Sequence, residues 1–125
     1  MKFSKIDENN IRIFVIDFYK RVIENKEVAP FFIDILGDDI NNKKWQEHID
    51  ILCDFWSSMI LKTNNYVGSP FAPHTTLKGL KKETFSQWLK ILDECVDNMY
   101  NKNCAKQFKT IGNIISENFM EKLGI

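Results

Sequence analysis

Apolar residues recur along this chain at the spacing of an α-helix, and this periodicity constrains the fold more than any other feature of the sequence. Within residues 11–22 they return at intervals of three and four positions, which places them on one face of a helix. The same spacing runs through residues 45–60, 85–99 and 108–123, and no segment alternates like a strand. The sequence therefore predicts an all-α chain with four main helices and short extra turns, in a single domain spanning residues 1–125.

The segments between these helices contain proline, glycine and polar residues. Pro30 disfavours helix at the residue before it and can open a short helix of its own, so Phe31 and Phe32 are predicted to form a tight corner with both rings pointing inward. Residues 33–42 are predicted to be a polar connection. Residues 64–74 have no regular period, and a loop of this length in a compact domain is often functional.

Charge balance and hydropathy exclude several classes of protein. Lys+Arg and Asp+Glu number 17 each, so the net charge is zero, whereas nucleic-acid binding usually requires a basic excess. No apolar run approaches the roughly 18 residues needed to cross a membrane. Polar and acidic residues follow Met1-Lys2-Phe3 at once, so there is no signal-peptide core. We expect a cytoplasmic protein that binds neither nucleic acid nor membranes.

The three cysteines, Cys53, Cys95 and Cys104, argue against cysteine-based chemistry. Their odd number and the absence of a Cys-x-x-Cys pair disfavour a disulfide framework or a dithiol redox motif. A zinc site of three cysteines and one histidine would require a different spacing. Cys53 and Cys95 fall on apolar helical stripes, where a thiol behaves as a small hydrophobic group.

Four side chains combine a ring with a hydrogen-bonding group and are placed to reach the interior. Tyr19, His48 and Trp88 lie on the apolar stripes of three different helices, and His74 ends the proline-rich loop. Taken alone, each is more often a satisfied core residue than a ligand-binding one. An unpaired donor in a dry core costs about 1–3 kcal/mol, so several converging donors favour a bound molecule with polar contacts. Periodicity does not identify that molecule.

Short motifs distributed over residues 3–123 point to a known family. In chain order they are Phe18-Tyr19, Ala29-Pro30-Phe31-Phe32, Trp45-Gln46-Glu47-His48, Phe55-Trp56, Gly68-Ser69-Pro70 leading to His74, Phe85-Ser86-Gln87-Trp88-Leu89, and Tyr100. In these motifs the chain resembles a group III (P-type) bacterial truncated haemoglobin. Its five glycines are all isolated, whereas members of groups I and II usually carry Gly-Gly pairs at helix junctions.

The resemblance implies a truncated-globin fold, a 2-over-2 helical sandwich around one haem. The haem would be haem b (iron protoporphyrin IX), bound non-covalently because no Cys-x-x-Cys attachment motif occurs. His74 would be the proximal iron ligand, and Tyr19, His48 and Trp88 would face the distal, ligand-binding side. The pocket walls implied by the same resemblance are Phe31, Phe32, Leu52, Trp56, Tyr66, Leu77 and Phe85.

A haem protein that binds O2 and related diatomic ligands, NO and CO among them, is the function implied by this resemblance. Tyrosine O–H and tryptophan N–H groups donate charge-assisted hydrogen bonds to bound oxygen and slow its release. An enzyme with NO-dioxygenase-like or peroxidase-like chemistry would need a separate reductase, because the chain has no Gly-x-Gly-x-x-Gly stretch. A non-enzymatic carrier for oxygen transport, or a sensor, stays open. So does a cofactor-free helical interaction module whose aromatic residues all belong to the core.

Overall fold

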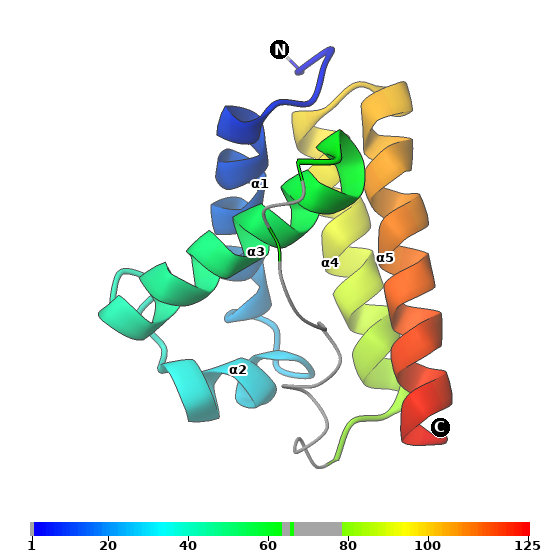
Figure 1. Cartoon of the computed structure of the whole chain (residues 1–125). Coiled ribbons are helices and arrows are strands. Elements are labelled where there is room, and N and C mark those ends of the chain that lie inside the picture. Colours follow the sequence, from blue (N-terminus) through cyan, green and yellow to red (C-terminus); the bar gives the residue numbers. More distant parts are fainter. Residues whose placement is uncertain (1, 64–65, 67–78) are drawn as a thin grey trace.

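Five α-helices make up most of the described chain in the computed structural model, which describes residues 2–63, 66 and 79–125 (Figure 1). They are α1 (Glu8–Val22), α2 (Ala29–Leu36), α3 (Lys43–Leu61), α4 (Lys82–Met99) and α5 (Lys102–Leu123). These residues contain no strand, only one isolated bridge between Phe3 and Tyr100. None of these five helices is apolar over enough of its length to span a membrane. The prediction of an all-α fold is confirmed.

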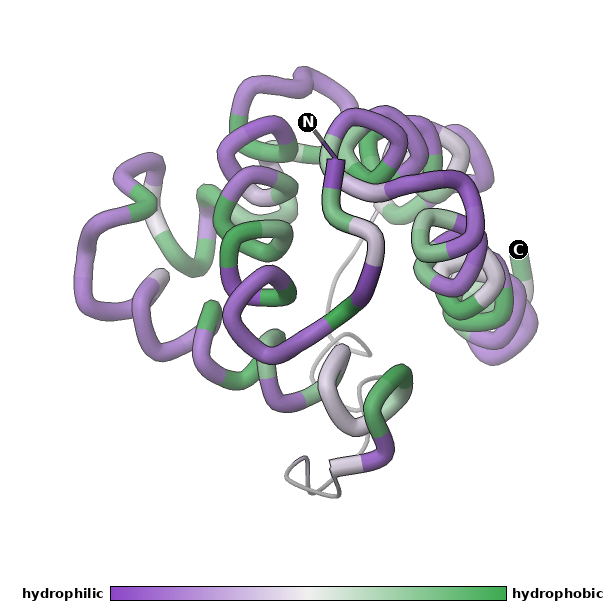
Figure 2. The backbone as a smooth tube through the Cα atoms, turned by 90° about the horizontal axis from the view of Figure 1, so that it is seen from above, coloured by the Kyte–Doolittle hydropathy of each residue, from purple (hydrophilic) through white to green (hydrophobic). Residues whose placement is uncertain are grey.

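The helices pack as two pairs. α1 lies against α3 and α4 lies against α5, and a third contact, between α1 and α4, joins the pairs. Figure 1 shows α4 and α5 running side by side in opposite directions, with α3 crossing α1 obliquely. Seen from above in Figure 2, hydrophobic and hydrophilic residues alternate along each helix, as the helical period requires. This arrangement is the 2-over-2 helical sandwich that the family resemblance implies.

Polar side chains set the starts of three helices. Asp7 and Asn10 cap α1 reciprocally: each side-chain oxygen accepts a hydrogen bond from the other residue's backbone N–H, at 2.8 and 3.0 Å. Asn42 caps α3 and Asn101 caps α5 by accepting a bond from a backbone N–H in the first turn. These caps satisfy N–H groups that have no partner within the helix.

Two predicted boundaries are wrong. α2 continues to Leu36, so the first part of the predicted connection at residues 33–42 is helical. Ile33 and Leu36 extend the apolar character of this short helix beyond Phe32. α5 begins at Lys102, well before the apolar run that starts at Phe108, because Asn101 caps a first turn that carries little hydrophobic signal.

Aromatic rings fill one end of the bundle. We call this cluster of Phe14, Tyr100 and Phe108 the closed end. The ring of Phe108 lies 4.6 Å from that of Phe14 and 4.8 Å from that of Tyr100 between centroids. The Tyr100 hydroxyl donates to Asn10 Oδ1 at 2.8 Å, so its polar group is paired. Close ring packing and a paired hydroxyl leave this end without room for a ligand.

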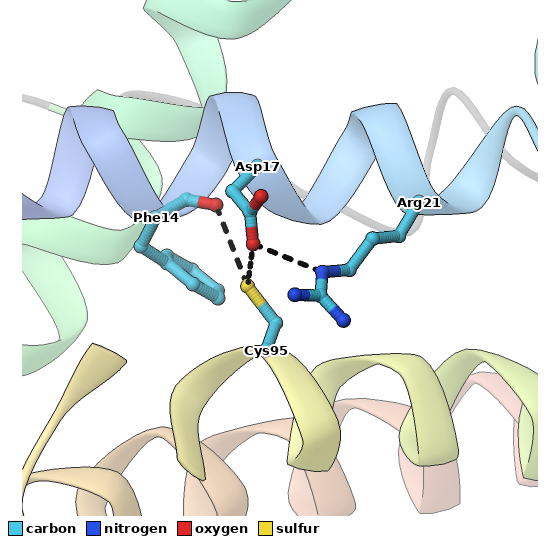
Figure 3. A network of polar contacts seen from close by, with 4 residues as sticks. All are labelled: Phe14, Asp17, Arg21 and Cys95. Atoms are coloured by element: carbon cyan, nitrogen blue, oxygen red, sulfur yellow. Dashed lines mark hydrogen bonds and ion pairs between the residues drawn. The ribbon is translucent and has the colours of Figure 1, made fainter. Parts of the chain in front are cut away.

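A polar contact around Cys95 fixes α1 against α4 (Figure 3). The Cys95 thiol donates to Asp17 Oδ2 at 3.1 Å, and the same oxygen accepts from Arg21 Nε at 3.0 Å. Burial, and then the hydrogen bond and charge of Asp17, raise the pKa of the Cys95 thiol, so the thiol stays protonated. Cys95 thus adds a polar contact to the apolar packing that the sequence predicts. All three cysteines are buried and free.

Candidate functional site

A largely apolar cavity of about 360 Å³ lies between the α1–α3 and α4–α5 pairs. Residues from all five helices line it, and most of them are aliphatic or aromatic. Small-molecule sites in proteins have a volume of roughly 300–1,000 Å³ and combine apolar walls with a few placed polar groups. The cavity has both properties, in contrast to the closed end of the bundle.

Six of the seven predicted wall residues line this cavity. They are Phe31, Phe32, Leu52, Trp56, Tyr66 and Phe85. The seventh, Leu77, lies outside the described residues. The rings of Phe31 and Phe32 both face the cavity from the start of α2, as expected for a tight corner after Pro30.

Local contacts hold these walls in place. Phe32 packs edge-on against Tyr19, with 5.3 Å between ring centroids. The backbone N–H of Tyr66 donates to Ser58 Oγ at 2.9 Å, and its ring lies edge-on to Phe55 at 5.3 Å. These contacts with the last turns of α3 fix the position of Tyr66.

Tyr19, His48 and Trp88, predicted from three separate helices, come together at one wall of the cavity. The Tyr19 ring is 4% exposed and stands perpendicular to His48, with 6.1 Å between centroids. The Trp88 side chain lies near the Tyr19 hydroxyl, where its N–H, which can only donate, favours the ionised oxygen.

The protonation state of Tyr19 follows from its surroundings. Burial raises the pKa of Tyr19 well above its ordinary value, and the nearby Trp88 N–H opposes this shift only in part. The hydroxyl therefore stays protonated at any physiological pH. Tyr19 is a permanent hydrogen-bond donor at the cavity wall.

His48 stands among aromatic rings. Its ring centroid lies 5.8 Å from that of Trp45 and 6.5 Å from that of Phe32, and Tyr19 is the third neighbour. Trp45 is itself anchored, because its indole N–H donates to the Gly37 carbonyl at 2.7 Å. The connection between α2 and α3 thus fixes the Trp45 ring, which packs against His48.

Sequence reasoning missed the contribution of α5. Ile115, Ser116 and Phe119 line the cavity, and Gly112 lets α5 approach α4 so closely that a Cβ at this position would overlap Leu92. The small residues Gly112 and Ser116 stand four apart on the otherwise apolar stripe of 108–123. That break in the stripe is the signal that could have revealed them.

The iron ligand predicted from the sequence, His74, lies outside the described residues, so its role stays a prediction. Within the described ranges, no three His, Cys, Asp or Glu side chains gather into a site for a bare metal ion. A haem iron is held differently, by the porphyrin and typically one proximal imidazole in globins.

Comparisons with known proteins agree with this geometry. No family model matches the chain. The chain is 28% identical over 123 residues to the group 3 truncated haemoglobin ctb of Campylobacter jejuni, covering 98% of this chain and 95% of the relative. The crystal structure of a group III truncated haemoglobin from Campylobacter jejuni matches with a TM-score of 0.90, 28% identity and the same coverage of both chains. The predicted resemblance is therefore confirmed: the chain has the truncated-globin fold and is similar to the group III truncated haemoglobins.

Proposed function

We propose that the cavity holds one haem b, bound non-covalently, and that the protein binds O2 and related diatomic ligands at the haem iron. One observation carries this proposal: a large apolar cavity has Tyr19, His48 and Trp88 gathered at one wall. The likeness to proteins described as truncated haemoglobins supports it.

The residues present fit a haem. Apolar walls from five helices suit a flat, apolar ring system, and the few polar groups suit an iron-bound ligand. Ser116 supplies a further sign, because its buried hydroxyl has no hydrogen-bond partner among the described residues. A cavity built around an occupant leaves such groups unpaired until the occupant arrives.

His74 would hold the iron through one nitrogen of a neutral imidazole, the commonest haem ligation in globins. Haem, when bound, would supply a ferrous iron able to bind a diatomic ligand. Tyr19 and Trp88, which both line the cavity, would donate hydrogen bonds to that ligand.

We propose NO- or peroxide-directed chemistry ahead of simple oxygen delivery. A buried, permanently protonated donor slows the release of a ligand that carries negative charge, and a carrier must release its ligand. Electrons would come from a separate reductase. Oxygen transport and sensing are the alternative functions.

Oxygen dissociation and turnover, measured on one preparation of haem-loaded protein, test this function. We expect slow oxygen release together with NO consumption or peroxide reduction in the presence of an external reductant. Rapid release without turnover would favour a carrier. In a parallel arm, His74→Ala should lose stable haem binding, and a variant that keeps a normal five-coordinate haem would show that another residue is the ligand.

A further inference from the structure

The cavity reaches the surface of the protein between α2 and α3. Ile35 of α2 and Ile51 of α3 both line it, yet their side chains are 54% and 52% exposed. Every other lining residue in the described part of the chain is buried or only partly exposed. We call Ile35 and Ile51 the mouth of the cavity. An occupant of the cavity comes nearest to the solvent at this mouth.

The segment that forms the mouth carries an excess of acidic residues. Residues 33–54 contain six carboxylates and two lysines, although the whole chain is neutral with 17 charges of each sign. The rest of the chain therefore holds 11 carboxylates and 15 basic residues. The neutral total conceals a separation of charge, with negative charge concentrated around α2 and the first half of α3.

Two of these carboxylates flank Ile51 on α3. Glu47 lies one turn before Ile51 and Asp54 one turn after it, so the three share one face of the helix, and all are exposed. Neither carboxylate forms an ion pair with a described residue, whereas Asp50 on the same helix is paired with Arg12 at 2.7 Å.

Two further carboxylates follow the other half of the mouth. Asp38 and Asp39 come three and four residues after Ile35, directly beyond the end of α2, and both are exposed. They too form no ion pair with any residue that the structure describes. We call Asp38, Asp39, Glu47 and Asp54 the acidic rim.

The lining of the cavity offers no cation to carboxylates of an occupant. The described lining residues include no lysine or arginine. A carboxylate buried against them would lose its hydration without an ion pair in exchange. Such groups stay hydrated at the mouth, where they add to the negative charge of the acidic rim.

We propose that the mouth docks a basic electron-transfer protein whose redox cofactor reaches the surface inside a ring of lysines or arginines. The inference rests on the proposed haem function, in which electrons come from a separate protein. Ile35 and Ile51 give this partner a small apolar centre, and the acidic rim selects its charge. A partner with an acidic surface would be repelled.

The physics of electron transfer favours this place. The rate falls steeply with distance, so a partner must dock where the occupant of the cavity comes nearest to the surface. Complementary charges speed the encounter and orient the two proteins, and salt weakens this steering. Transient electron-transfer complexes typically bury less than about 1,200 Å², and two half-exposed isoleucines suit so small a contact.

The test uses a basic c-type cytochrome as the probe and an acidic blue-copper protein for comparison. The ferrous haem-loaded protein gives one electron to the ferric cytochrome; the first iron becomes ferric, the second ferrous, and no proton moves. Stopped-flow spectroscopy without oxygen follows the reaction. We expect the second-order rate constant to fall about tenfold or more between about 10 mM and about 300 mM salt. The blue-copper protein should react slowly at low salt and faster as salt is added.

Charge reversal locates the docking surface. The double variant Glu47→Lys with Asp54→Lys should slow the cytochrome reaction about tenfold or more at low salt. Glu94→Lys with Glu117→Lys is the matched control, because it changes the net charge equally at exposed residues of α4 and α5 that do not line the cavity. It should slow the reaction less than about twofold. The absorption spectrum of the CO complex shows whether each variant binds haem normally.

Amide NMR spectra give a readout that does not depend on electron transfer. Addition of the reduced cytochrome to ¹⁵N-labelled, CO-bound protein should shift the signals of the acidic rim and of both mouth isoleucines at low salt. The shifts should disappear at high salt. Shifts centred on α4 or α5 would place the partner elsewhere and overturn the proposal.

Three kinetic outcomes also count against the inference while leaving the haem function intact. They are a rate that does not depend on salt, an equal loss of rate in the rim variant and its control, and a faster reaction with the acidic protein. If the wild-type protein takes up no haem, no ferrous form can be prepared. The proposed function then fails, and this inference fails with it.

Discussion

Two buried tyrosines near the two ends of α1 show how differently this fold treats the same side chain. Tyr100 packs on Phe108 and donates its hydroxyl proton to Asn10, which lies near the start of α1. Tyr19, near the end of α1, lines the cavity beside His48 and Trp88. The Tyr100 hydroxyl is thus used within the fold, whereas Tyr19 is a candidate for ligand binding.

The two regions that contain these tyrosines, the closed end and the cavity, differ in the same way. At the closed end the aromatic rings contact one another. The cavity wall of Tyr19, His48 and Trp88 carries hydrogen-bonding groups around a space that the described side chains do not fill. Substitutions at the closed end should therefore change stability, and substitutions at the cavity should change ligand binding.

The largest expected effect is at the closed end. Phe108→Ala removes a fully buried ring and should lower the free energy of unfolding by about 3–5 kcal/mol. Phe32 is only half-buried beside the cavity. Phe32→Ala should therefore lower the free energy of unfolding of the cofactor-free protein by only about 1 kcal/mol. Urea denaturation of both variants without haem measures the difference. Equal losses would mean that the cavity end is packed as tightly as the closed end.

The tyrosine pair sharpens the comparison. Tyr100→Phe removes a donor to Asn10 and should cost about 1–2 kcal/mol of unfolding free energy, with oxygen kinetics unchanged. Tyr19→Phe should change the stability of the cofactor-free protein by less than about 1 kcal/mol. In the haem-loaded protein the same variant should speed oxygen release about tenfold or more, as followed by stopped-flow spectroscopy. Identical oxygen release rates in Tyr19→Phe and wild type would show that Tyr19 does not donate a hydrogen bond to the bound ligand.

A smaller effect is expected from pH at the α1–α4 contact. Burial and Asp17 raise the pKa of the Cys95 thiol above its ordinary value of 9.0, so the folded protein holds this proton at a pH where the unfolded chain releases it. The stabilisation is complete below the unfolded pKa and is lost as the pH rises above it. Cys95→Ala should flatten the fall in stability between about pH 8 and pH 10. Cys104→Ala, a second buried cysteine, is the control, and an equal slope in wild type and Cys95→Ala would contradict the assignment.

The helices were largely predictable because their signal is local. A repeat of three and four residues fixes which face of each helix is apolar before any tertiary contact forms. The start of α5 was missed because Lys102 and the residues after it carry few apolar side chains, and only the Asn101 cap marks that turn. The extension of α2 to Leu36 was missed for a related reason, since an eight-residue helix is too short to show a clear period.

The site was predictable where a ring with a polar group stood on an apolar stripe. Tyr19, His48 and Trp88 had that form, and the fold brings them to one wall. Ser116 carries no ring, and its only signal is the break that it and Gly112 make in the apolar stripe of α5. The proximity of Trp88 to Tyr19 depends on how α4 packs against α1, and no single segment of the sequence encodes that packing.

The most direct test of the central claim is an absorption titration of cofactor-free protein with haem. If the cavity between the two helix pairs is a haem site, a sharp Soret band should grow and saturate at one haem per chain. Prior substitution of the cavity wall residue Leu52 by Trp should weaken that binding strongly. Binding that never saturates, or that is the same in wild type and Leu52→Trp, would contradict the claim.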